Sequence, residues 1–176
     1  MSIVTLTHKD YRLIRVDPDL IESLLPVLVP ILKMSIPYSS GFDTVEGMLD
    51  VMRQSKRPWQ LWMMLKGDEA VGAFISTIQN FGDERLFQFE ILAGVEAQSW
   101  ILPMIHKFEQ YLHFMYGVTQ VSVVGREGWS KFLKDSGYIP HSFITAKVSI
   151  TPDPEVQAQL SSPIVHSNGD TVLLEV

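Results

Sequence analysis

The pattern of apolar and polar positions divides the chain into short strands and a few amphipathic helices. The run YRLIRV at residues 11–16 predicts a strand. Asp17 and Pro18 then predict a helix start, because aspartate caps free amides and proline is tolerated at the first helical position. We expect this helix to reach about Lys33, kinked at two internal prolines, and a second helix to cover residues 44–54.

Three apolar runs come next, and turn-forming residues end each of them. They cover residues 59–65, 70–78 and 85–93. Short apolar runs separated by such turns predict an antiparallel meander. Alternation along the third run predicts that Phe87, Phe89 and Ile91 share one face of the sheet, with Gln88 and Glu90 on the other.

The sequence of the second half of the domain predicts alternating helices and strands. Ser99 is the expected cap of a helix from Trp100 to about Tyr116, and Gly117 is its expected stop. A strand, a helix and a further strand then cover residues 119–124, 126–136 and 142–150. The order β-α-α-β-β-β-α-β-α-β predicts an α/β (or α+β) domain with a mixed, mostly antiparallel sheet and about four helices.

The composition changes after residue 150. The stretch TPDPEVQAQLSSPIVHSNGDTVLLEV contains three prolines and four acidic residues but no Lys or Arg. We therefore predict a domain over residues 1–151 and an acidic, extended C-terminal arm over residues 152–176. The last six residues, TVLLEV, have the pattern of one terminal strand, which joins either its own sheet or that of another chain.

Composition excludes several classes of protein. Hydrophobic residues make up 46% of the 176 positions, so a full core can form, and the net charge of −6 without a basic run argues against nucleic acid. The absence of cysteine excludes disulfides and thiol catalysis. The longest apolar run, LLPVLVPILKM, is too short for a bilayer, and the N-terminus lacks a signal-peptide pattern. These features predict a soluble cytoplasmic protein without a membrane partner.

The best family marker is the run FLKDSGY at residues 132–138. Together with the order of elements over residues 11–150, it resembles the GNAT fold of acyl-CoA-dependent N-acetyltransferases, in which a sequence like FYEKLGF follows a strand and a short helix. Gly137 and Tyr138 stand where that family has Gly-Phe. The longer pattern GR-x-GW-x-x-x-L-x-x-x-GY is also similar to GNAT-like proteins of tailed bacteriophages, including an internal virion protein of short-tailed phages.

The resemblance implies a V-shaped cleft in which the fourth strand and third helix splay from the fifth strand. Acyl-CoA lies there, and a glycine-rich turn presents backbone amides to its pyrophosphate. The family signature is Gln or Arg, two residues, Gly, one residue, then Gly or Ala. No glycine follows Gln98 at this place; Trp100 and Pro103 occupy the turn, and Glu96 adds an anion. No Lys or Arg lies between residues 85 and 107.

Two further positions concern the chemistry. The resemblance places a general-acid Tyr at the position of Leu133, which has no proton to give, and it makes Glu90 the candidate base for the acceptor amine. Glu90 also occupies an alternating strand position, so solvent exposure alone explains it. If acyl-CoA binds, the resemblance places its contacts at Ile91, Leu92, Ala97, Gln98 and Ser99, although Gln98 and Ser99 are also ordinary helix-cap residues.

These observations lead to two hypotheses of function. The first is a GNAT-fold protein with a degraded acyl-CoA site and no cofactor, serving as a structural, virion-associated phage protein in the host cytoplasm and the virion. Its partners are other protein subunits or copies of itself. The alternative is an acetyl-CoA-dependent N-acetyltransferase with an unknown acceptor, including a toxin-like one, in which Glu90 acts through water. No metal site is expected, because His106 and His113 lie two helical turns apart.

Overall fold

The computed structural model describes residues 4–38, 44–54, 59–124, 128–141, 144–147, 150, 152–161, 164–165 and 171–172. Its helices are α1 (Ile21–Lys33), α2 (Val45–Gln54), α3 (Ala97–Tyr116), α4 (Gly128–Leu133) and α5 (Pro154–Ser161). Its strands are β1 (Thr5–His8), β2 (Tyr11–Val16), β3 (Gln60–Lys66), β4 (Glu69–Phe81), β5 (Glu84–Gly94), β6 (Gln120–Val124), β7 (Tyr138–His141), β8 (Ile144–Lys147), β9 (Ile164–Val165) and β10 (Thr171–Val172).

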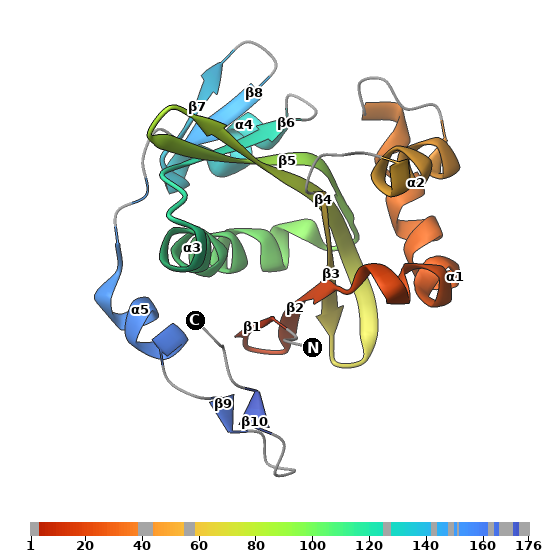
Figure 1. Ribbon diagram of the computed structural model, residues 1–176, viewed down its shortest axis with the longest axis horizontal. Coiled ribbons are helices and arrows are strands. Elements are labelled where there is room, and N and C mark those ends of the chain that lie inside the picture. Colours follow the sequence, from red (N-terminus) through yellow and green to blue (C-terminus); the bar gives the residue numbers. More distant parts are fainter. Residues whose placement is uncertain are drawn as a thin grey trace.

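Eight strands form one curved sheet, in the order β1-β2-β3-β4-β5-β6-β8-β7 (Figure 1). All neighbours in this sheet run antiparallel except β5 and β6, which are parallel. The long hairpin of β4 and β5 stands at the centre and carries the most extensive pairing. The predicted α/β class and the mixed, mostly antiparallel sheet are therefore confirmed.

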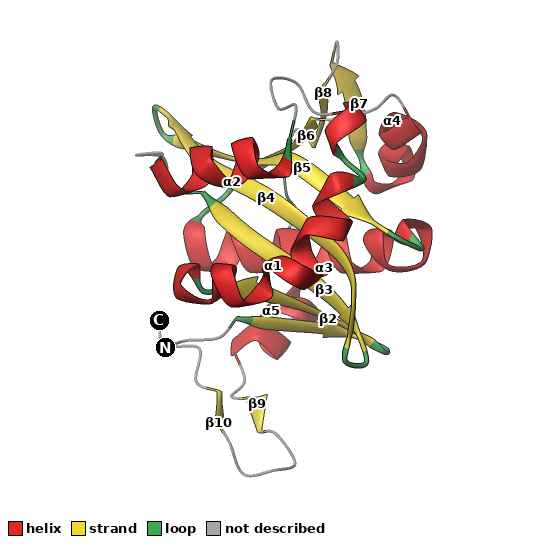
Figure 2. Ribbon diagram, turned by 90° about the vertical axis from the view of Figure 1, so that its right-hand side faces the viewer, coloured by secondary structure: helices red, strands yellow, loops and turns green. Residues whose placement is uncertain are grey.

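The two faces of the central sheet are covered by different helices, α3 on one side and α1 with α2 on the other (Figure 2). The face toward α3 is rich in aromatic rings. Phe108 lies at its centre, with ring centroids 4.8 Å from Trp62 and 5.2 Å from Phe87. Edge-to-face packing of this kind adds to the free energy gained from burying the rings.

A β-bulge in the central hairpin changes which face β5 presents. Ile75 pairs with Ile91, but the next residue of β4, Ser76, pairs with Phe89, so Glu90 has no partner in the ladder. Phe87 and Phe89 therefore pack toward α3, whereas Ile91 packs toward α1 and α2. The prediction that Phe87, Phe89 and Ile91 share a face is wrong, because one extra residue shifts the two-residue alternation.

The strands β5 and β6 separate at the same level. Their parallel pairing begins at Leu86 with Gln120 and ends at Phe89 with Val123, although β5 continues to Gly94. The bulge comes immediately after the last paired residue of β5. The predicted splay of the fourth and fifth strands of the GNAT arrangement is present here between β5 and β6.

Several element boundaries differ from the sequence prediction. The helix predicted from Trp100 begins at Ala97, and its N-cap is Glu96 in a left-handed conformation instead of Ser99. The helix predicted over 126–136 is α4 followed by a 3-10 turn, with residues 125–127 outside the described part. The strand predicted over 142–150 is β8, with residues 142–143 and 148–149 outside the described part, and β1 and β7 are additional strands.

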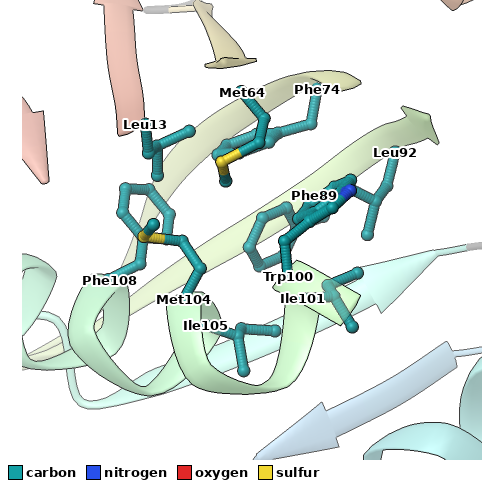
Figure 3. Close-up of a pocket in the computed structure, with 10 residues that line it drawn as sticks. All are labelled: Leu13, Met64, Phe74, Phe89, Leu92, Trp100, Ile101, Met104, Ile105 and Phe108. Atoms are coloured by element: carbon teal, nitrogen blue, oxygen red, sulfur yellow. The ribbon is translucent and has the colours of Figure 1, made fainter. Parts of the chain in front are cut away.

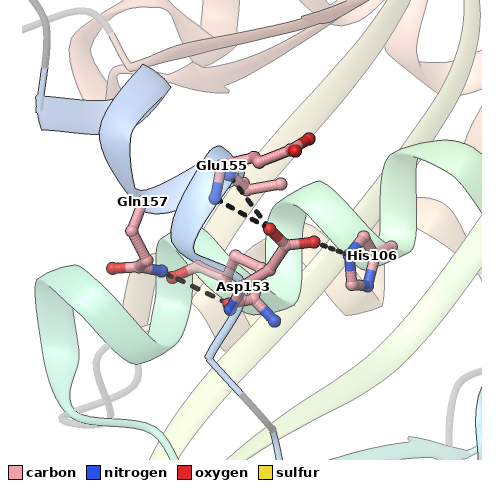
Figure 4. A network of polar contacts seen from close by, with 6 residues as sticks. His106, Asp153, Glu155 and Gln157 are labelled. Atoms are coloured by element: carbon pink, nitrogen blue, oxygen red, sulfur yellow. Dashed lines mark hydrogen bonds and ion pairs between the residues drawn. The ribbon is translucent and has the colours of Figure 1, made fainter.

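The arm contains a helix, α5, where the sequence predicted an extended chain. Asp153 caps it by accepting hydrogen bonds from the amides of Glu155 at 3.0 Å and Val156 at 3.3 Å. The same residue binds α3: its amide donates to Gln110 Oε1 at 2.7 Å, and its carboxylate lies 3.2 Å from His106 Nε2 (Figure 4). The bond to His106, followed by the hydrogen bonds from the amides of Val156 and Glu155, lowers the pKa of Asp153.

Among the helices within the described residues, none has the length and apolar character needed to cross a bilayer.

The aromatic core makes a first prediction. Replacing Phe108 by Ala leaves a cavity among at least four rings, so we expect a loss of about 3–5 kcal/mol in the free energy of unfolding. The matched control is Phe114→Ala on the same helix, where the ring is 40% exposed and the change should stay within about 0.5 kcal/mol. Urea unfolding measures both, and equal losses would contradict the assigned core.

Candidate functional site

Glu90 lies at the bulge, on the face of the sheet opposite α3, and is half-buried. Thr77 Oγ1 donates a hydrogen bond to Glu90 Oε1 at 2.9 Å, and Gln88 Nε2 donates to Glu90 Oε2 at 2.9 Å. Both carboxylate oxygens are therefore held by neutral donors from β4 and β5. This arrangement fixes the orientation of the side chain and leaves it reachable from solvent, which is compatible with a role as a base.

The turn between β5 and α3 is the place where the resemblance puts the pyrophosphate. Only two residues, Val95 and Glu96, connect the end of β5 at Gly94 to the start of α3 at Ala97. The amide of Val95 donates to the carbonyl of Val71 on β4 at 2.8 Å, so it continues the sheet and does not face a ligand. No side chain caps the first amides of α3. A turn this short has no glycine-rich segment that can surround a phosphate group.

Trp100 packs against the inner side of this turn. Its ring is 2% exposed, and its indole Nε1 donates to the carbonyl of Val95 at 3.0 Å. The ring lies against two glycines of neighbouring strands: a Cβ added at Gly72 or Gly94 would lie 2.7 Å or 2.8 Å from Trp100 Cζ2. The glycines near this turn therefore make room for an indole of the same chain, whereas the family signature uses glycine to let a cofactor approach.

The charge at the turn includes a cation that sequence reasoning missed. Lys66, at the end of β3, lies with its Nζ 2.9 Å from Glu96 Oε2. This hydrogen bond raises the pKa of Lys66, and its ammonium also lies 5.7 Å from the centroid of the Tyr11 ring. Because Lys66 is bound to Glu96, the two charges offset each other, and the turn offers little net attraction to an anion.

The cofactor contacts implied by the resemblance are distributed over two faces. Leu92 lies toward α3, beside Trp100 and Ile101, whereas Ile91 is buried on the opposite face. Ala97 is half-buried, and Gln98 and Ser99 are exposed at the start of α3. Leu92 lines a small cavity of about 20 Å³ whose walls are entirely apolar, formed by β2, β3, β4, β5 and α3 (Figure 3).

The position at which the resemblance places a general acid is buried. Leu133 is fully buried and belongs to the core on the α3 side. The nearby Tyr138 is also buried, and its hydroxyl donates to Glu109 Oε1 at 2.6 Å. Burial, with the adjacent carboxylate of Glu109, raises the pKa of Tyr138 well above its usual value. Neither residue presents an exchangeable proton to the gap between β5 and β6.

The two histidines of α3 have separate surroundings. His106 lies beside Asp153, and His113 Nδ1 lies 3.0 Å from the carbonyl oxygen of Val118. Within the described part of the chain, no group of three His, Cys, Asp or Glu side chains is placed to hold a metal ion.

Comparisons with known proteins identify the fold. No model of a protein family matches the chain, and no curated protein matches it. Among solved structures, the ribosomal-protein-S5-alanine acetyltransferase of Vibrio fischeri is similar with a TM-score of 0.61 at 9% identity, covering 86% of this chain and 100% of that one. RimL, a ribosomal L7/L12 α-N-protein acetyltransferase in complex with coenzyme A, gives 0.57 at 9% identity, covering 84% of this chain and 98% of that one.

A third neighbour is the ribosomal-protein-S18-alanine N-acetyltransferase of Escherichia coli, with a TM-score of 0.53 at 11% identity over 82% of this chain and 97% of that one. These likenesses show that the chain has the GNAT acetyltransferase fold. At such identities a shared fold does not carry a shared activity.

The packing of Trp100 against this turn leads to a second prediction. Gly94→Ala places a Cβ 2.7 Å from the Val71 carbonyl oxygen and against Trp100, so it should lower the free energy of unfolding by about 1–3 kcal/mol. Gly128→Ala is the control, since no atom lies within 4 Å of its added Cβ. Thermal unfolding measures both variants. If Gly94→Ala has the stability of the wild type, Trp100 does not close the turn as described.

Proposed function

We propose that this GNAT-fold chain does not hold acyl-CoA at the position used by the family, and that it serves as a noncatalytic module that binds other protein subunits. The observation that carries the proposal is the two-residue turn after β5, with the Val95 amide bonded to β4 and Trp100 packed beneath it. In this proposal the GNAT arrangement of strands and helices is kept as a scaffold.

A pyrophosphate would gain little free energy by binding at this turn. Such a group needs several unpaired amides and a positive local field in return for the water it loses. Here one amide is committed to the sheet, and the Glu96 carboxylate stands at the start of α3 with Lys66 as its counter-ion. An incoming pyrophosphate would have to displace Glu96 from Lys66 before it gained any attraction.

The acid–base chemistry supports the same conclusion. Thiolate departure from acyl-CoA is assisted by a proton donor in the GNAT arrangement, and Leu133 occupies that position from within the core. Tyr138, the nearest alternative in sequence, is bonded to Glu109. Of these two described residues, neither supplies a side-chain acid at this place.

Exposed apolar side chains on α1 and the residues around it support the proposal of protein partners. Leu20, Val27 and Met34 recur every seven residues, so they lie along one side of the helix, and they are 49%, 43% and 41% exposed. Tyr38, 53% exposed, lies shortly after them in the chain. Exposed apolar stripes of this kind mark interaction surfaces. The resemblance of residues 125–138 to phage GNAT-like proteins favours a virion as the setting.

One observation favours the alternative, an acetyl-CoA-dependent N-acetyltransferase. The splay of β5 from β6 is present, and Glu90 stands at the bulge beside it with both oxygens held in place. A carboxylate so placed can take a proton from an acceptor amine through water. RimL, a structural neighbour at 9% identity, is described in complex with coenzyme A.

Titration with acetyl-CoA separates the two functions. Our proposal predicts no saturable heat in calorimetry and an unchanged melting temperature at millimolar acetyl-CoA. A bound ligand at 100 times its Kd would stabilise the folded state by about 2.7 kcal/mol, which a melting curve detects easily.

A saturable rise in melting temperature contradicts the proposal and opens the test of the alternative. In that case Glu90→Gln should lower kcat by about 10²–10⁴ with an amine acceptor while leaving acetyl-CoA affinity unchanged, because only the base is removed. The control is Glu84→Gln at the exposed start of β5, which makes the same chemical change away from the bulge and leaves the base intact.

A further inference from the structure

A basic cleft lies between α4 and β7. It has a volume of about 510 Å³ and is lined by Ser130, Lys131, Lys134, Gly137, Tyr138 and Ile139. Lys131 and Lys134 are exposed and three residues apart, so both ammonium groups reach the same opening. Among the described residues neither lysine has an acidic partner within ion-pair distance. Ile139 adds an apolar surface that is 50% exposed.

The C-terminal arm has the complementary chemistry. Residues 152–176 contain four acidic residues and no Lys or Arg, although the chain as a whole has 14 basic residues. Asp153 and Glu155 lie at the start of α5, where Asp153 already pairs with His106. The other two, Asp170 and Glu175, flank the apolar run TVLL. An acidic segment with an apolar centre matches a cleft that has two lysines and an exposed isoleucine.

The described part of the arm in the same molecule does not extend toward this cleft. Hydrogen bonds from Asp153 and Gln157 to Gln110 fix α5 against α3. Beyond α5, the pair β9–β10 stands at the end of the molecule opposite α4 and β7 in both views (Figures 1 and 2). A contact between arm and cleft therefore joins two molecules.

We infer that the cleft between α4 and β7 receives the acidic segment of residues 170–176 from a second copy of the chain. This inference rests on the proposed noncatalytic role and names the partner as the chain itself. Opposite charges draw the segment in, and Ile139 packs against its apolar centre. β7 is an edge strand of the sheet, so no further strand of the sheet covers that side within the described residues.

The short length of β7 and its proline limit the backbone hydrogen bonds that can hold the segment. Pro140 removes one backbone donor from β7, which is only four residues long. A long hydrogen-bonded ladder is therefore not available, and side-chain charge with apolar contact supplies most of the attraction. Such binding weakens as salt screens the charges, with a Debye length of about 8 Å at physiological ionic strength.

The geometry of the contact has a consequence for assembly. The cleft and the arm are different surfaces, so each molecule offers one of each, and the contact is heterologous. Made in one direction, such contacts produce closed rings or open chains, and two molecules that exchange arms form a twofold dimer. An open chain adds subunits one by one, as expected of a structural component.

Sedimentation velocity on the full chain tests this inference with charge-reversal variants. We expect the wild type to associate with rising concentration and to dissociate in high salt. Lys131→Glu with Lys134→Glu should abolish association, and so should Asp170→Lys with Glu175→Lys, because each variant then has a cleft and an arm of like charge. Lys9→Glu with Arg85→Glu is the control with the same change in net charge as the cleft variant, and it should associate as the wild type does.

Mixing the two charge-reversed variants in equal amounts gives the decisive result. In the mixture each acidic cleft meets a basic arm and each basic cleft meets an acidic arm, so association should return. A variant that had merely failed to fold would not be rescued. A monomeric wild type, unchanged association of the lysine variant, or no recovery in the mixture overturns the inference.

The outcome is independent of the acetyl-CoA titration. A wild type that stays monomeric and also fails to bind acetyl-CoA overturns this contact only. Binding of acetyl-CoA overturns the proposed function whether or not the chain associates.

Discussion

The bulge at Glu90 is the constraint on which the rest of the structure depends. By leaving one residue out of the ladder between β4 and β5, it turns Phe87 and Phe89 toward α3 and Ile91 and Ala93 toward α1 and α2. One strand thus contributes to two cores. The parallel pairing with β6 stops just before the bulge, so the same irregularity marks where the two strands separate.

The segment between the bulge and α3 forms the turn at which the resemblance places the pyrophosphate. The last part of β5 stays paired with β4 as far as Gly94 with Gly72, and Val95 extends that pairing by bonding to Val71. The chain then enters α3 after one more residue, and Trp100 folds back under the two glycines. A splayed pair of strands and a closed turn therefore coexist. The fold is the GNAT fold, and at the turn where the resemblance places a pyrophosphate, the indole of Trp100 packs against Gly72 and Gly94.

Much of this architecture could be predicted from residues that typically begin or end helices, strands and turns. Asp17-Pro18, the Gly-containing turns of the meander and Gly117 mark element ends correctly to within a few residues. The helix α5 was missed although Asp153-Pro154 repeats the pattern of Asp17-Pro18, and both aspartates cap their turns. The signal was present, but the proline-rich, polar composition of the arm favoured an extended chain.

Other features had no local signal. A bulge depends on how two strands pair, so the alternation of Phe87, Phe89 and Ile91 gave no warning of it. Lys66 meets Glu96 across 30 positions of sequence, and only the strand register brings them together. The missing glycine after Gln98 and the presence of Leu133 were visible in the sequence, but Trp100 as the group that fills the turn emerges only from the packing.

The most direct measurement of the central claim is an NMR titration of the ¹⁵N-labelled chain with coenzyme A, monitored at the amides of Val95 to Ser99. The account predicts that these signals do not move in a saturable way, because the turn is bonded to β4 and closed by Trp100. Saturable shifts centred on these amides would show that the turn opens and holds the pyrophosphate, and would contradict the account.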